Sequence, residues 1–219
     1  MTLPREEVVP GLIDELGQFE ALVRSLGATD CARPSRCGGW TAGDVAAHVI
    51  GQLVDVAAGR FDGLGTPEVT ARQVQERRGR TPEELADELA ETTAVADAIL
   101  GTFDDAAWSG PSPTGGGSLG DGVEALWFDA ALHADDIRDA IGRDSELDSG
   151  LRVAISHLAQ VLSDQGYRPV TLQLEGLDPF PVSGGGPTIT GAPDQFVLAA
   201  TGRADASRIG LDETINVYR

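Results

Sequence analysis

Apolar residues recur every three or four positions in four long segments of the first 143 residues. This spacing predicts helices over residues 5–26, 41–59 and 81–100, and a fourth helix that reaches residue 143. The apolar stripe expected on the fourth helix is Leu119, Val123, Leu126, Ala130, Ile137 and Ile141. Four helices within the first 143 residues predict a helical bundle.

The boundaries of these helices have their own signals. Thr41 and Asp44 form the pattern of a capping box at the start of the second helix. Pro10 predicts a kink or a late start in the first helix, because proline removes a backbone hydrogen bond. Residues 60–80 are expected to form a loop between two helices. Residues 108–122 are expected to form another, because this stretch is rich in glycine and proline.

The pattern changes after residue 145. Residues 149–165 again have helical spacing, whereas residues 169–176 and 180–184 read as two strands separated by a turn. A helix is expected over residues 192–203, and residues 214–219 are expected to form a short closing strand.

These two patterns together predict an α+β protein with two domains. A four-helix bundle is expected over residues 1–145, and a small α/β domain is expected over residues 146–219.

Composition narrows the classes of partner. The net charge of −19 and the isoelectric point near 4.3 would repel a phosphate backbone, so nucleic acid is not an expected partner. The chain contains no lysine, which excludes Schiff-base chemistry by the protein itself.

The expected compartment is the cytoplasm. The sequence shows no apolar run long enough to span a bilayer and no secretory leader pattern, so a membrane is not an expected partner. Its two cysteines, Cys31 and Cys37, are too few for a secreted disulfide framework and are expected to be reduced.

Polar residues interrupt the apolar faces of two predicted bundle helices. His133 falls in the gap between Ala130 and Ile137, and Asp129 lies one turn before it. His48 takes a core position on the second helix. Two inward histidines and an inward carboxylate are the ligands of a three-residue metal site with an open position, and this set favours zinc while admitting other divalent ions.

An alternative explains the same residues without an ion. Asp129 and His133, four residues apart, can form a hydrogen-bonded pair, with His48 an unrelated core residue. The spacing does not decide between the two interpretations, because it does not give the distance from His48 to the pair.

Three stretches resemble the mycothiol-dependent maleylpyruvate isomerase family, which belongs to the DinB-like metal-binding bundles. They are GGWTAGDVAAHVIG (38–51), FDAALHADDIRDAIGR (128–143) and TITGAPDQFVLAATGR (188–203). The resemblance covers nearly the whole chain and implies a DinB-like four-helix bundle with a small C-terminal α/β domain.

The resemblance implies a zinc ion bound by His48, Asp129 and His133, with mycothiol as the thiol cofactor or cosubstrate. The family pattern has glutamate where this chain has Asp129, which is one methylene shorter. Asp136 is a candidate to orient a ligand; its alternative is a solvated acid at the helix edge. Arg203 is similar in position to a catalytic arginine of the family; its alternative is a surface arginine near a helix end.

Three functional hypotheses follow. The chain is a zinc-dependent isomerase or S-transferase that uses mycothiol on a small electrophile, or a non-catalytic metal- or ligand-binding regulatory module of the same fold. In the third hypothesis the polar residues are a structural hydrogen-bonded cluster in an interaction protein. The sequence indicates neither the electrophile nor the oligomeric state.

Overall fold

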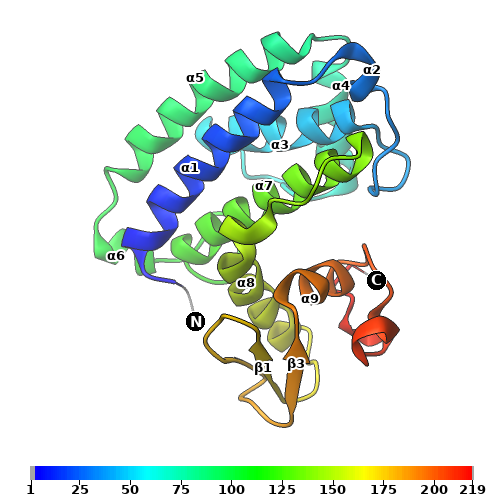
Figure 1. Cartoon of the computed structure of the whole chain (residues 1–219). Helices are drawn as coiled ribbons and strands as arrows, with labels where there is room; N and C mark the ends of the chain where they lie inside the picture. The colour runs from blue at the N-terminus through cyan, green and yellow to red at the C-terminus, as the bar shows by residue number, and fades with distance from the viewer. Residues whose placement is uncertain (1–2, 219) are drawn as a thin grey trace. The chain divides into compact units, whose positions relative to one another are not determined.

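The computed structural model describes residues 3–218, apart from the side chains of residues 148 and 149. Two compact units make up the chain: residues 4–146 form one, and residues 147–218 together with residue 3 form the other. The first is built from helices and the second combines helices with a small sheet (Figure 1). The predicted α+β class is therefore confirmed.

Four long helices build the first unit: α1 (Arg5–Arg24), α3 (Ala42–Ala57), α5 (Pro82–Leu100) and α7 (Leu119–Ile141). Both α1 and α3 pack against α5 and against α7 (Figure 1). The capping box predicted at Thr41 and Asp44 is present at the start of α3. Helix α1 already begins at Arg5 and contains Pro10, so the late start suggested for this helix is wrong.

Three shorter helices connect the long ones: α2 (Ala28–Cys31), α4 (Pro67–Arg77) and α6 (Asp105–Ser109). Helix α4 corrects the expectation of a loop over residues 60–80. Its buried residues are Gln73, Val74 and Arg77, so an apolar stripe is missing where the helix meets its neighbours. The N-cap Thr66, followed by proline at the first helical position, was the available signal.

Helix α7 buries residues on more faces than the predicted apolar stripe alone. Val123, Ala130 and Ile137 are buried as expected, but Leu119, Leu126 and Ile141 are half-buried. Other faces bury Trp127, Phe128 and Leu132. Since α7 packs on both α1 and α3, its middle section lies in the interior.

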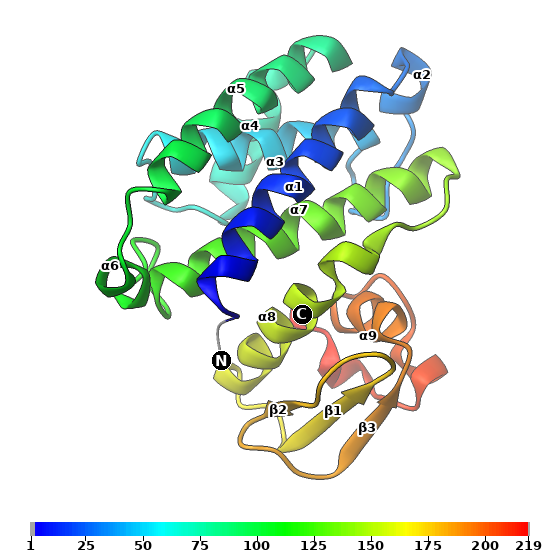
Figure 2. The same cartoon turned by 60° about the vertical axis from the view of Figure 1, so that its left-hand side comes forward.

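The second unit contains a three-stranded sheet with the order β2-β1-β3 (Figure 2). Strand β1 (Val170–Leu174) pairs antiparallel with β2 (Phe180–Val182) and parallel with β3 (Thr188–Gly191). Helix α8 (Leu151–Asp164) follows the short η1 (Leu147–Gly150) and packs on β2 and on α9 (Pro193–Ala200).

The strands predicted over residues 169–176 and 180–184 are present, and β3 was not expected. The strand predicted over residues 214–219 is wrong: η2 (Ala206–Ile209) and η3 (Glu213–Ile215) are short helical turns, and Arg219 lies outside the described residues. Asp212 caps η3 by accepting from the Thr214 amide, which favours the turn over an extended strand.

Candidate metal centre

Three polar side chains meet inside the helical unit. His48 comes from α3, and Asp129 and His133 come from α7; one potential ligand atom of each lies within 4.8 Å of the others. His48 and His133 are buried, whereas the Asp129 side chain is 22% exposed. The structure thus brings together the three residues that the sequence placed on two inward faces.

Both imidazoles present Nε2 to the same carboxylate. The Nε2 atom of His48 lies 3.8 Å from Asp129 Oδ2, and the Nε2 atom of His133 lies 3.5 Å from Asp129 Oδ1. The two rings meet edge to face with their centroids 5.3 Å apart. Gln52, one turn after His48 on α3, donates to Asp129 Oδ2 at 3.2 Å and holds the shorter acid in place.

The other nitrogen of His48 faces an amide. His48 Nδ1 lies 3.0 Å from Gln73 Oε1, and Gln73 Nε2 donates to Asp55 Oδ2 at 2.7 Å. Because an ionised carboxylate only accepts, the Gln73 amide must turn its nitrogen to Asp55 and its oxygen to His48. The Gln73 oxygen that faces Nδ1 can only accept, so this arrangement favours a proton on Nδ1 of His48.

The other nitrogen of His133 faces a carboxylate. His133 Nδ1 lies 2.9 Å from Asp136 Oδ2, and Asp136 is completely buried. Arg36 Nε donates to Asp136 Oδ1 at 3.1 Å, and Cys37 Sγ donates to Asp136 Oδ2 at 3.1 Å. Burial excludes the solvated acid considered for Asp136. Its contact with His133 is of the kind that orients metal-binding histidines, and this role of Asp136 stays a prediction.

The two histidines differ in their affinity for a proton. Burial lowers the pKa of His48, with His133 acting in the same direction and Asp129 and Gln73 opposing it. Burial alone would also lower the pKa of His133, but Asp129, Asp136 and Cys37 raise it to about 10. At neutral pH His48 is thus neutral, and His133 is a cation between two carboxylates.

The donor set fits a divalent transition metal. Two imidazole Nε2 atoms and one carboxylate are a common set of three protein ligands, and in both imidazoles Nδ1 is hydrogen-bonded in the way that leaves Nε2 available. The ion would replace the Nε2 proton of His133. A second group, Cys37, His133 and Asp136, also places its potential ligand atoms within 4.8 Å.

The two groups compete for His133. The first uses His133 through Nε2 and the second through Nδ1, the atom that donates to Asp136. Arg36, bonded to the same Asp136, would repel a cation in the second group. The His48 group is therefore the better candidate, and its assignment as the ligand set stays a prediction.

Arg203 belongs to the other unit. It lies three residues after the end of α9, half-buried, and its Nη1 donates to the Thr201 carbonyl at 3.3 Å. The role of Arg203 stays a prediction.

The sequence did not predict the residues that support the cluster: Arg36, Cys37, Gln52, Asp55 and Gln73. Gln52 comes four positions after His48, and Asp55 comes seven positions after it. Helical spacing could therefore have placed both residues near the site. Gln73 carried no signal, because its helix was not expected.

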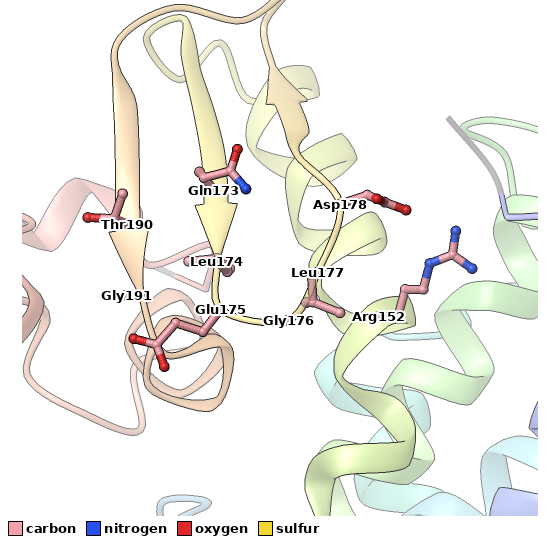
Figure 3. Close-up of a pocket in the computed structure, with 9 residues that line it drawn as sticks. All are labelled: Arg152, Gln173, Leu174, Glu175, Gly176, Leu177, Asp178, Thr190 and Gly191. Carbon is pink, nitrogen blue, oxygen red and sulfur yellow. The ribbon is translucent and has the colours of Figure 1, made fainter.

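A cavity of about 750 Å³ lies in the second unit, at the carboxyl ends of β1 and β3. Its charged lining residues are Arg152, Glu175 and Asp178. In Figure 3 the carboxylate of Glu175 and the guanidinium of Arg152 lie apart, on either side of Leu177. Both groups of potential metal ligands found among the described residues lie in the helical unit.

None of the helices in the described part of the chain combines the length and the apolar character needed to cross a bilayer.

The sequence matches one family model over residues 12–138, more than half of the chain; the model is described as mycothiol maleylpyruvate isomerase N-terminal domain. A search among curated proteins finds no match.

Two solved structures are similar to this protein over nearly the whole chain. One, described as the mycothiol-dependent maleylpyruvate isomerase, is 19% identical, with a TM-score of 0.69 and 96% of each chain covered. The other, a histidine-to-alanine mutant of the mycothiol-dependent maleylpyruvate isomerase, is 18% identical, with a TM-score of 0.67 and the same coverage. At these identities the likeness shows a shared fold.

Proposed function

The chain belongs to the mycothiol maleylpyruvate isomerase family, and from this membership we propose that it is a metal-dependent enzyme that uses mycothiol on a small electrophile. The reaction class is cis–trans isomerisation or S-transfer. The observation that carries the proposal is the approach of two imidazole Nε2 atoms to one carboxylate. In each ring the other nitrogen, Nδ1, faces a partner of its own, Gln73 or Asp136, as is usual for histidines that bind a metal through Nε2.

In this proposal His48, Asp129 and His133 are the ligands of zinc or another divalent ion. When bound, such an ion stabilises a thiolate over a thiol and so supplies a nucleophile at neutral pH. Gln52 and Asp136 hold the Asp129 carboxylate and the His133 ring in position.

Addition of the thiolate to the electrophile is the first step in both reaction classes. Its sulfur adds to one carbon of an activated alkene, and the electron pair of the double bond moves to the activating group. Rotation about the new single bond and expulsion of the thiolate give the isomer without net consumption of thiol. Protonation of the adduct instead gives an S-conjugate. Arg203 is proposed to bind an anionic group of the electrophile.

The setting proposed is the cytoplasm. In a reducing compartment Cys31 and Cys37 would both stay thiols.

Metal content is the test of this proposal. Protein purified without a histidine tag should contain about one zinc per chain by elemental analysis. Asp129→Ala should lose most of this zinc, and Asp139→Ala, a change of a half-exposed acid on the same helix, should retain it. Absence of bound metal in the parent after zinc is supplied would contradict the proposal.

Activity separates the enzyme from its alternative. The zinc-loaded protein should accelerate the addition of mycothiol to activated alkenes, measured by loss of free thiol or by isomer formation. Zinc without any such acceleration would favour the non-catalytic metal- or ligand-binding module. Arg203→Met should lower kcat/KM for an anionic electrophile and leave zinc content unchanged, whereas the exposed Arg208→Met should change neither.

A further inference from the structure

His48 lies between two hydrogen-bond acceptors, and the neutral ring has one proton to offer. Gln73 Oε1 lies 3.0 Å from Nδ1, and Asp129 Oδ2 lies 3.8 Å from Nε2. We infer that Gln73, oriented by Asp55, is the positioning residue that holds this proton on Nδ1 and so leaves Nε2 free to bind the metal. The inference rests on the proposed metal site.

The position of the proton decides whether His48 can be a ligand. With the proton on Nε2, the ring would point its N–H toward Asp129 and have no lone pair directed at the cluster. Asp129 is a carboxylate and therefore the stronger acceptor, so it favours this unproductive tautomer. The shorter contact with Gln73 opposes it, and one hydrogen bond is enough to decide between two tautomers of similar energy.

Asp55 prevents the Gln73 amide from turning over. Its side chain is almost completely buried, and it also accepts from Arg72 Nη2 at 2.6 Å and from Arg60 Nε at 2.9 Å. A flipped amide would place Oε1 of Gln73 against Oδ2 of Asp55 and an N–H donor against His48 Nδ1. Both contacts would then be repulsive for the proton arrangement described, so Asp55 sets the direction of the amide.

The helix that carries Gln73 is fixed close to α3. A Cβ atom at Gly51 would lie 2.6 Å from the Cβ of Gln73, so only glycine allows this approach. Arg77, buried on the same helix, donates to the Gln73 carbonyl at 3.1 Å and forms two 2.9 Å bonds with Glu88 on α5. Helix α4 is thereby anchored on α3 and α5, and Gln73 has a defined position.

The test compares Gln73→Met with Gln75→Met, a change of an exposed glutamine on the same helix. Methionine has a similar length but offers no strong acceptor to Nδ1. In the metal-free proteins, long-range ¹H–¹⁵N correlation spectra of the imidazoles report the tautomer of His48. We expect Nδ1–H in the parent and in Gln75→Met, and a shift to Nε2–H in Gln73→Met.

Metal affinity is measured on the same proteins by competition with a chromophoric chelator. Zinc affinity should fall about 10- to 100-fold in Gln73→Met, as for other residues that orient a metal-binding histidine, and should not change in Gln75→Met. Gln73→Glu keeps an acceptor facing Nδ1, so it should retain the Nδ1–H tautomer, while the repulsion between its second oxygen and Asp55 should lower the stability of the fold. If Gln73 had only a structural role, the His48 tautomer would be the same in Gln73→Glu and in Gln73→Met.

Three results would overturn the inference: an Nε2–H tautomer in the parent, an Nδ1–H tautomer in Gln73→Met, or an undiminished zinc affinity in Gln73→Met. A parent that binds no zinc while its tautomers behave as expected would instead overturn the metal-dependent function, and would leave the control of the His48 proton by Gln73 standing.

Discussion

The two histidines of the cluster face the same carboxylate through Nε2, but their Nδ1 atoms face different kinds of group. His48 is backed by the neutral amide of Gln73, and its pKa is lowered chiefly by burial. His133 is backed by the buried carboxylate of Asp136, and its pKa is raised to about 10. One ring is therefore ready to bind a cation, while the other already carries a positive charge that an incoming ion must displace.

This asymmetry balances charge in the helical unit. In the absence of an ion, protonated His133 lies between Asp129 and the buried Asp136, and together with Arg36 it offsets the charge of Asp136. When an ion binds, it brings that positive charge itself, and the proton leaves. A second charged histidine would add repulsion, which the neutral partner of His48 avoids.

The largest difference between the two histidines is expected in the stability of the metal-free protein. His133→Ala removes one of the two cationic partners of the buried Asp136, which keeps Arg36, and should lower the free energy of unfolding by about 3 kcal/mol. His48→Ala leaves one amide acceptor unsatisfied and should cost about 1 to 3 kcal/mol. Urea denaturation with a chelator present measures both, while elemental analysis should find zinc lost from both. Equal destabilisation would contradict the asymmetry.

A pH dependence of zinc affinity should follow from the charge on His133. Its pKa is raised to about 10, so the ion competes with one proton at all lower pH values. Apparent affinity should rise about tenfold per pH unit between about pH 7 and about pH 9, with about one proton released per ion. Calorimetry in buffers of different ionisation enthalpy counts this proton, and a flat affinity over the range would show that His133 is neutral.

The same group has the opposite effect on the metal-free fold. Because the folded-state pKa of His133 lies above its unfolded value, its contribution to stability is complete below about pH 6.5 and is lost as the pH rises through about 10.

The support of His133 can be weakened without removing the ring. Asp136→Asn keeps an acceptor for Nδ1 but removes the charge, and it should weaken zinc binding about 10- to 100-fold. Asp139→Asn is the matched control, since this acid is 52% exposed on the same helix and also faces Arg36. Chelator competition should find the control within about twofold of the parent; an equal loss in both variants would indicate a general charge effect.

The smallest effect is expected at Cys37. Its thiol donates to Asp136 but is not a ligand in the His48 group, so Cys37→Ser should retain zinc with an affinity within a few-fold of the parent. The cobalt-substituted parent should lack the intense near-ultraviolet absorption of a cobalt–thiolate bond. Such a band, abolished in Cys37→Ser, would assign the ion to the Cys37 group instead.

The bundle helices were predictable because each carries an apolar stripe that burial requires. Helices α3 and α7 bury aliphatic side chains at helical spacing, and their starts are fixed by local capping boxes at Thr41 and Ser118. Helix α4 buries mainly polar groups, and the closing strand expected after residue 213 is replaced by a turn capped by Asp212. Where a helix buries polar side chains, or where a local cap favours a turn, the spacing of apolar residues does not predict the secondary structure.

The sequence by itself determined that His48, Asp129 and His133 interrupt apolar faces, because that property depends only on positions along single helices. It did not determine that the histidines meet at one carboxylate or which of their nitrogens are protonated. His48 and Gln73 are separated by 25 positions, and Cys37 and Asp136 by 99. Contacts of this kind depend on how α3, α4 and α7 pack, since packing alone chooses which polar group faces each Nδ1 atom and so where each proton resides.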